Sequence, residues 1–269
     1  MSFSIDGKTA IITGAANGIG LAVARRFADV GANVMLADID EEKLKSEVAL
    51  LSDKGNEARC FAGDLREKLT LANLLSATLD AFDRVDILIN ASRQVLTSDP
   101  LDAKKDNFDA MWKQNVHANL RLSQIVAKRF IHQADEDTDV DAPAGSIVNL
   151  TSIASERTHP DLLAYSVSCA ALNQMTRSLA VSLAPKLVRV NAISIGSVMS
   201  ASLQSVLSEE EDLRESVESV TPLGYIAEAD SVAEAAQFLA SDASEFITGQ
   251  VLTIDGGRTL IDPAATAFH

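Results

Sequence analysis

Thr13-Gly14-Ala15-Ala16-Asn17-Gly18-Ile19-Gly20 is the stretch of this 269-residue chain that decides its fold. It follows a short apolar run typical of a strand and opens a segment with the apolar spacing of a helix. Three glycines in this setting permit a tight turn, let the backbone approach a pyrophosphate group and allow close packing of the helix on the strand. The N–H groups that begin the helix can then bind phosphates. We therefore expect a dinucleotide site at Gly14, Asn17, Gly18, Ile19 and Gly20.

Two acidic positions extend this expected site. Asp38 ends the next strand-like run, eighteen residues after Gly20. A carboxylate there can accept hydrogen bonds from adenosine ribose hydroxyls and would repel a 2′-phosphate, so the pattern favours NAD over NADP. Asp64 and Leu65 follow a third strand-like run. Asp64 has two open interpretations, contact with the adenine or capping of a helix that begins near Glu67.

Strand-like and helix-like segments alternate along the whole chain. This alternation predicts an α/β fold of three layers, in which a doubly wound parallel sheet is covered by helices on both faces with right-handed crossovers. No linker or repeat divides the chain, so we expect a single domain over residues 1–269. The expected strands are Lys8–Thr13, Asn33–Asp38, Glu57–Ala62, Asp86–Asn90, Ser146–Thr151, Val188–Ser194 and Val251–Ile254, and the expected helices are Gly18–Val30, Glu41–Asp53, Glu67–Phe82, Lys104–Ile131, Leu162–Ala184 and Ser231–Ala240.

Two segments interrupt the alternation. Asp135–Asp141 contains five acidic residues in seven, which is typical of a solvated surface loop. Ser197–Thr221 is irregular and follows a strand end, where open α/β sheets bind ligands. It fits either a mobile lid over a substrate or a plain surface helix.

Composition excludes several classes of partner. The chain carries 38 acidic against 23 basic residues, a net charge of −15, so neither a nucleic acid nor an anionic membrane surface is expected to bind it. Cys60 and Cys169 do not have the spacing of a metal site, and no metal is expected. The start of the chain has no signal-peptide pattern, and no apolar run approaches the ~18 residues that span a bilayer. These features indicate a cytoplasmic protein.

Further motifs follow in a fixed order. Asn115, Ser152 and Tyr165 are followed by Asn191–Gly196 and by the run from Ile247 through Gly257. Together with the glycine loop, they resemble the short-chain dehydrogenase/reductase family from about Asp6 to Gly257. The resemblance implies a seven-stranded Rossmann sheet and NAD-dependent hydride transfer between a nicotinamide and a secondary alcohol or carbonyl substrate. It also implies a homotetramer or dimer that packs through the two long helices, Lys104–Ile131 and Leu162–Ala184.

The resemblance assigns roles position by position. Ser152 would orient the substrate oxygen, and Tyr165 would exchange a proton with it. Asn115 would bend its helix around a water of the proton relay, while Asn90 and Gly196 would lie at the nicotinamide. Each residue also has a simpler interpretation, as a strand-end cap, a half-buried helix tyrosine or a solvated helix residue. Their joint occurrence at this spacing favours the inherited site.

Three positions depart from the family pattern. Cys169 stands where the pattern has a lysine, which would bind the nicotinamide ribose and lower the pKa of the tyrosine. A pKa lowered by three units would represent roughly 4 kcal/mol, and a neutral thiol supplies almost none of it. Arg93 stands in place of a glycine, and Ile195 in place of a proline. We therefore expect impaired turnover, and a catalytically silent dinucleotide-binding or scaffold protein is the alternative.

Arg93 and Cys169 each leave two interpretations open. Arg93 either swings its guanidinium into the space of the missing lysine head or is solvated. Cys169 is either a nucleophile, which needs a neighbouring base and a lowered pKa, or a small apolar helix residue.

Overall fold

The computed structural model describes residues 3–136, 143–200, 203–204, 207 and 211–262 of the chain. Its strands form one seven-stranded sheet of order β3-β2-β1-β4-β5-β6-β7, and every neighbouring pair is parallel. This confirms the predicted Rossmann-like α/β fold. The strands are β1 (Thr9–Thr13), β2 (Asn33–Asp38), β3 (Ala58–Ala62), β4 (Ile87–Asn90), β5 (Gly145–Ser152), β6 (Val188–Ile195) and β7 (Val251–Ile254).

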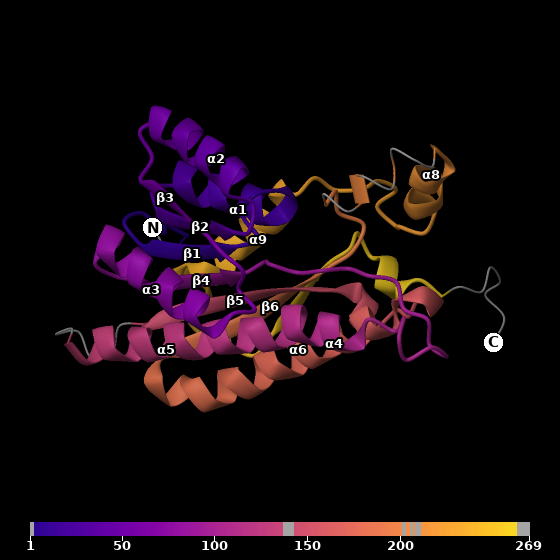
Figure 1. Ribbon diagram of the computed structural model, residues 1–269. Helices are drawn as coiled ribbons and strands as arrows, with labels where there is room; N and C mark the ends of the chain where they lie inside the picture. The colour runs from indigo at the N-terminus through magenta and orange to yellow at the C-terminus, as the bar shows by residue number, and fades with distance from the viewer. Residues whose placement is uncertain (1–2, 137–142, 201–202, 205–206, 208–210, 263–269) are drawn as a thin grey trace.

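Helices cover both faces of the sheet, as Figure 1 shows. One face carries α1 (Gly18–Asp29), α2 (Glu41–Asp53) and α9 (Asp230–Ala240). The other carries α3 (Lys68–Phe82), α5 (Asn119–Glu136) and α6 (Leu163–Leu183). The central strands are buried throughout, because apolar helix faces pack on both of their sides. No helix among the described residues is long and apolar enough to cross a bilayer.

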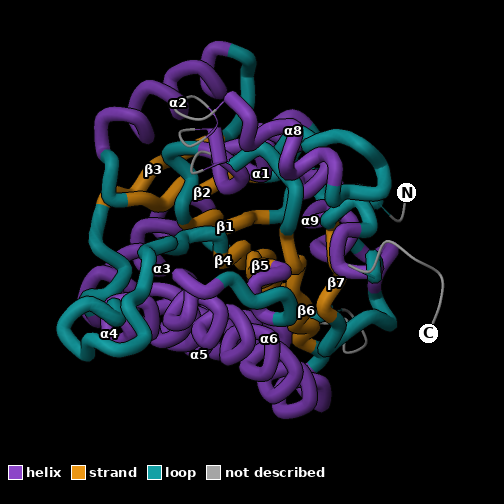
Figure 2. Tube along the Cα trace, turned by 90° about the vertical axis from the view of Figure 1, so that its right-hand side faces the viewer, coloured by secondary structure: helices purple, strands orange, loops and turns teal. Residues whose placement is uncertain are grey.

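The strand order changes direction at β1, which lies between β2 and β4. Chains that leave the carboxyl ends of β1 and β4 therefore run to opposite sides and open a crevice between them. Figure 2 shows the sheet as one twisted layer with the two sets of helices on either side. The glycine loop that begins at Gly14 and the loop that begins at Ala91 meet at this crevice.

The long helix expected over Lys104–Ile131 was wrong at both ends, because the observed helical run begins at Phe108 and continues to Glu136. Residues 99–106 form successive turns, in which the carboxylates of Asp99, Asp102 and Asp106 each accept a nearby backbone N–H. Asn107 then adopts a left-handed conformation with φ 54°, so the helix cannot begin before Phe108. It runs on as α4 (Phe108–Met111), a π-helical segment η1 (Trp112–Ala118) and α5. The other predicted strands and helices lie within one residue of the observed ends.

The irregular segment 197–221 leaves the carboxyl end of β6 and returns close to its start. The hydroxyl oxygens of Ser197 and Thr221 lie 2.9 Å apart at its two ends. Its described part includes the helix α8 (Glu211–Ser219), which stands away from the sheet in Figure 1. Residues 201–202, 205–206 and 208–210 lie outside the described residues, so the lid stays a prediction. Of the acidic run Asp135–Asp141, the first two residues end α5 and the rest lie outside the described residues.

Candidate active site

The glycine loop is packed too tightly for side chains. Gly14 has φ +65°, and a Cβ there would lie 2.9 Å from the backbone of Ala91. A Cβ on Gly20 would lie 2.1 Å from the carbonyl oxygen of Gly14. The Asn17 side chain makes no capping hydrogen bond to α1, so the first N–H groups of that helix are left for a ligand. The loop and helix therefore fit the phosphates of a dinucleotide.

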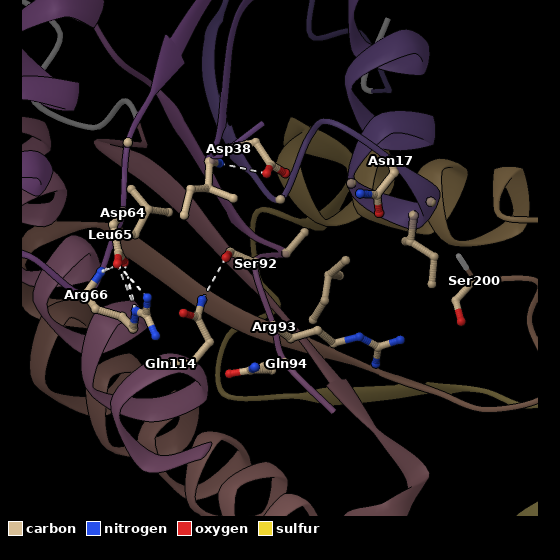
Figure 3. A pocket seen from close by; sticks show the side chains of 18 of the residues that line it. Asn17, Asp38, Asp64, Leu65, Arg66, Ser92, Arg93, Gln94, Gln114 and Ser200 are labelled. Carbon is tan, nitrogen blue, oxygen red and sulfur yellow. Dashed lines mark hydrogen bonds and ion pairs between the residues drawn. The ribbon is translucent and has the colours of Figure 1, made fainter. Parts of the chain in front are cut away.

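A cleft of about 310 Å³ continues from this loop across the carboxyl ends of the strands. Figure 3 shows that side chains from the glycine loop, from the end of β2 and from the loops after β3 and β4 surround it. Most of the predicted dinucleotide residues line this cleft, namely Gly14, Asn17, Gly18, Ile19, Gly20, Asp38, Asp64 and Leu65.

Two predicted dinucleotide residues are absent from the lining of this cleft. The Asn90 side chain is buried and donates to Asn149 Oδ1 at 2.8 Å and to Ser123 Oγ at 3.0 Å, so only its backbone could reach a ligand. Gly196 packs against Ile153, whose Cδ1 would lie 2.3 Å from an added Cβ. Sequence reasoning missed Arg66, Ser92, Gln94, Gln114 and Ser200, which also line the cleft. All but Gln114, which lies in the π-helical segment η1, belong to loops, and no periodicity marks loop residues that face a ligand.

Asp38 and Asp64 are held differently. Asp38 Oδ2 accepts the Ala16 N–H at 3.1 Å, and its Oδ1 accepts the Ile39 N–H at 2.7 Å, which fixes the carboxylate against the glycine loop. Asp64 pairs with Arg66, whose Nη2 lies 2.6 Å from Oδ2, and this pairing lowers the pKa of the Asp64 carboxyl. The Asp64 side chain also accepts the Arg66 N–H, which is a turn bond rather than a cap of α3. The predicted capping role was therefore wrong, while contact with an adenine stays a prediction.

Ser152 and Cys169 lie together beside the Tyr165 phenol. Ser152 ends β5, and its side chain lies close enough to the Tyr165 phenol to influence its pKa. Ser152 Oγ accepts the Ala154 N–H at 3.2 Å, which confirms its interpretation as a strand-end cap, while its role toward a substrate oxygen stays a prediction. Tyr165 and Cys169 lie one turn apart on α6, each only 4 % exposed. The sequence spacing thus brings the three side chains into one group.

Arg93 completes this group. Its Nη1 donates a hydrogen bond of 2.9 Å to Tyr165 Oη. Arg93 is half-buried, and it lines both the dinucleotide cleft and a small second cavity beside Cys169. The interpretation of Arg93 as a solvated residue was therefore wrong, and the guanidinium lies against the phenol oxygen.

The loop that carries Arg93 is fixed on both sides. Thr13 Oγ1 accepts the N–H groups of Ala91 and Ser92, each at 3.0 Å. Asn115 Oδ1 accepts the Gln94 N–H at 2.8 Å. Backbone anchors thus lie immediately before and after Arg93, and they set the direction in which its side chain leaves the loop.

Asn115, where a bend in the helix was expected, lies inside the π-helical segment η1. Widened turns of this kind leave a main-chain carbonyl without its helical partner. Here Asn119 Nδ2 donates to the Asn115 carbonyl oxygen at 2.8 Å. The Asn115 side chain also donates to Ser168 Oγ at 3.1 Å, which ties the bend to α6. Its part in a proton relay stays a prediction.

The environment of Tyr165 raises the pKa of its phenol. Burial is the largest cause, and the Arg93 charge opposes it by favouring the phenolate. The neighbouring Cys169 thiol raises the phenol pKa further, whereas the nearby Ser152 side chain lowers it. Burial likewise raises the pKa of Cys169. Both groups are therefore protonated near neutral pH.

Cys169 lacks the surroundings of a nucleophile. The groups that act on its thiol come from Tyr165, Arg93, Thr151 and Ser168, and none of them is a base that ionises near neutral pH. Its raised pKa points the same way, which supports its interpretation as a small buried helix residue. Within the described residues, no cluster of His, Cys, Asp and Glu side chains could hold a metal ion.

Comparison with known proteins places the chain in a family. Residues 14–259 match the family model described as enoyl-(acyl carrier protein) reductase. The match spans the glycine loop, the Ser152–Tyr165 pair and the closing glycines. The chain therefore belongs to the short-chain dehydrogenase/reductase family of oxidoreductases.

Individual relatives resemble the chain over nearly its whole length. The 7alpha-hydroxysteroid dehydrogenase of Escherichia coli K12 is 31% identical over 253 residues, which is 94% of each chain. A 7alpha-hydroxysteroid dehydrogenase complexed with NADH and 7-oxo glycochenodeoxycholic acid has a TM-score of 0.88 at 30% identity, covering 95% of this chain and 96% of the other. A gluconate 5-dehydrogenase from Burkholderia cenocepacia in complex with NADP and tartrate has a TM-score of 0.87 at 29% identity, covering 97% and 98%.

Proposed function

We propose that this protein transfers hydride between NAD and a secondary alcohol or carbonyl substrate, with Tyr165 as its proton donor and acceptor. The observation that carries this proposal is that the Tyr165 phenol, with Ser152 beside it, is joined to the dinucleotide cleft by Arg93, which lines the cleft and hydrogen-bonds that phenol. Two hydroxyl groups at one point can hold a single substrate oxygen. Related dehydrogenases that bind NADH or NADP share the fold over more than nine-tenths of the chain.

Each side chain has a defined part in this reaction. The bound nicotinamide accepts or supplies the hydride. Ser152 holds the substrate oxygen, and Tyr165 gives a proton to that oxygen in reduction or takes it in oxidation. Because the Tyr165 pKa is raised, the phenol is protonated near neutral pH and is ready to act as an acid. Reduction of a carbonyl is therefore the favoured direction.

NAD is the proposed cofactor because of Asp38. Its carboxylate lies in the cleft beside the glycine loop, at the end of β2. A negative charge here accepts ribose hydroxyls and repels a 2′-phosphate. Asn17 and Gly20 stand at the start of α1, where N–H groups would hold the pyrophosphate.

A homotetramer or dimer is part of the same proposal. Apolar side chains are exposed on the two long helices that the family pattern pairs between subunits. Trp112 is 43% exposed, and Val181 on α6 is 77% exposed. Light scattering at several concentrations would check this, because a monomer at every concentration contradicts it.

The alternative is a silent dinucleotide-binding protein, favoured by the neutral thiol of Cys169 beside the reacting phenol. Two measurements separate the alternatives. Calorimetry with NADH and NADPH tests the cleft, and NADH oxidation on a panel of steroid, sugar-acid and simple ketones tests turnover. Turnover that Tyr165→Phe abolishes while NADH binding survives supports the enzyme. NADH binding without turnover on any ketone favours the silent protein.

A further inference from the structure

We propose that Arg93 is a catalytic residue, whose guanidinium supplies the positive charge that stabilises the Tyr165 phenolate when the proton is exchanged. The catalytic role of Arg93 rests on the proposed function. The contact itself does not, because Nη1 donates directly to Tyr165 Oη over 2.9 Å. A cation that hydrogen-bonds an ionisable oxygen favours the charged form of that oxygen.

The groups that face the phenol come from three elements. The loop after β4 brings Arg93, the end of β5 brings Ser152, and α6 brings Cys169. Ser152 is neutral, and burial keeps the Cys169 thiol protonated near neutral pH, so neither cancels the guanidinium charge. The buried apolar side chains of Met111, Ala154 and Ala164 pack with Tyr165 and Cys169, and this low-dielectric surrounding strengthens the effect of one charge. Arg93 is thus the cation whose charge offsets part of the effect of burial.

The guanidinium is held in place before any reaction occurs. Thr13 fixes the backbone just before Arg93, and Asn115 fixes it just after. A charge that is already oriented stabilises a developing phenolate without the reorganisation that a free side chain would need. A surface arginine that touched Tyr165 by chance would not need four hydrogen bonds to the backbone around it.

Arginine restricts the role to charge. A guanidinium keeps its proton at any pH at which the protein is folded, so Arg93 cannot pass a proton onward. The proton must reach Tyr165 from the side of Ser152 and the substrate or through the small cavity beside Cys169. That cavity is lined by Arg93, Asn115 and Tyr165 among others and measures about 10 Å³, close to the space that one water needs.

The chain offers a direct measurement, because it contains only two tyrosines, Tyr165 and Tyr225. Tyr225 is 55% exposed, so Tyr225→Phe leaves Tyr165 as the single tyrosine with little loss of folding stability. Incorporation of a fluorinated tyrosine lowers the phenol pKa into the range in which the protein stays folded and provides one ¹⁹F resonance. Its chemical shift against pH then reports the Tyr165 pKa without cofactor, substrate or turnover.

We expect Arg93→Gln to raise this pKa by about one to three units, and Arg93→Lys to recover much of the shift because it keeps the charge. Arg66→Gln is the matched control, since it removes a cation that lines the same cleft but pairs with Asp64. Arg66→Gln should leave the titration midpoint of Tyr165 close to that of the protein with Arg66 and Arg93 unaltered. In the same series, kcat for alcohol oxidation should fall in Arg93→Gln and recover in Arg93→Lys.

The outcomes keep the two proposals apart. An unchanged midpoint in Arg93→Gln, or a shift of the same size in Arg66→Gln, overturns the inference even if the enzyme turns over. A raised midpoint together with no turnover on any ketone supports the charge contact and contradicts the proposed function. Circular dichroism on each variant checks that it is folded, so that titration midpoints are compared only between folded proteins. If Arg93→Gln does not fold, Arg93→Lys provides the second measurement of the Tyr165 pKa.

Discussion

Asn115 holds Gln94 at both of its main-chain polar groups. Its Oδ1 accepts the Gln94 N–H at 2.8 Å, and its Nδ2 donates to the Gln94 carbonyl oxygen at 2.9 Å. The same Nδ2 lies 3.1 Å from Ser168 Oγ on α6. One buried amide therefore joins the loop that carries Arg93 to the helix that carries Tyr165, so the two partners of the charge contact are positioned by a shared support.

The first prediction concerns this support. Asn115→Ala leaves the Gln94 N–H and carbonyl without their partners, so it should lower the free energy of unfolding by about 2 kcal/mol. It should also raise the Tyr165 pKa in the same direction as Arg93→Gln, because the loop no longer fixes the guanidinium. Urea unfolding and the ¹⁹F titration measure the two effects.

Gln237→Ala provides the control for Asn115→Ala. Gln237 on α9 is also buried and doubly bonded, since it donates to the Phe3 carbonyl oxygen and accepts from Arg26. It should lose similar stability without moving the Tyr165 pKa. Equal shifts of that pKa in both variants would mean that general loosening, rather than the position of Arg93, sets the phenol pKa.

The sequence predicted the frame of this site better than its chemistry. Asn33–Asp38 and Val251–Ile254 were predicted to the residue, because their apolar runs are bounded by polar residues or glycine. The start of the long helix was wrong, since nothing in a periodic pattern reveals that Asn107 takes a left-handed conformation. Local sequence patterns encode periodicity and turns well, but they do not encode the path of an irregular loop.

The contact of Arg93 shows the same limit more sharply. Arg93 and Tyr165 are 72 positions apart, and Arg93 lies in a loop without periodicity. Two interpretations of Arg93 were open, and only the tertiary contact between the loop after β4 and α6 could separate them. The hydrogen bonds from Asn115 to the main chain of Gln94 were missed for the same reason, because Gln94 becomes a neighbour of Asn115 only through the turn that Thr13 anchors.

The second prediction concerns cofactor choice. Asp38→Asn keeps the size of the side chain and one acceptor oxygen for the Ile39 and Asp40 N–H groups, but it loses the acceptor for the Ala16 N–H and removes the negative charge that would accept ribose hydroxyls. Hydrogen bonds to a charged group contribute about 1.5–3 kcal/mol, so NADH affinity should fall by about tenfold or more while NADPH affinity rises. Calorimetry with both cofactors measures this. Asp40→Asn, a substitution at the cap of α2, should leave the ratio of the two affinities unchanged. Tight NADPH binding by the unaltered protein would contradict the assignment of NAD.

The third prediction concerns pH. Burial raises the Tyr165 pKa above its ordinary value of 10.0, so the acid form dominates near neutral pH. The rate of ketone reduction should be flat between about pH 6 and 8 and should fall only as the pH rises through the Tyr165 pKa. Alcohol oxidation needs the phenolate, so its rate should rise about tenfold per pH unit over the same range. Identical pH profiles in the two directions, measured as kcat/KM with one ketone and alcohol pair, would contradict this.

The fourth prediction concerns the position one turn after Tyr165. Cys169→Lys introduces a second cation beside the phenol, in a cavity whose lining already includes Arg93. Two like charges cannot both stabilise one phenolate at full strength, so the gain in turnover should be small in the unaltered protein. In an Arg93→Gln background the introduced lysine meets no competing charge, and the same substitution should raise turnover by about tenfold or more, the equivalent of one pKa unit.

A double-mutant cycle over Arg93→Gln and Cys169→Lys makes this competition measurable. A gain that is much larger without Arg93 than with it shows that both cations act on the same phenol. Equal gains in turnover in the two backgrounds would mean that the guanidinium charge does not act on the Tyr165 phenol oxygen. Arg93 would then be a structural residue of the loop. The cycle therefore decides whether the positive charge at Tyr165 is supplied by Arg93 on the loop after β4 instead of by a residue on α6.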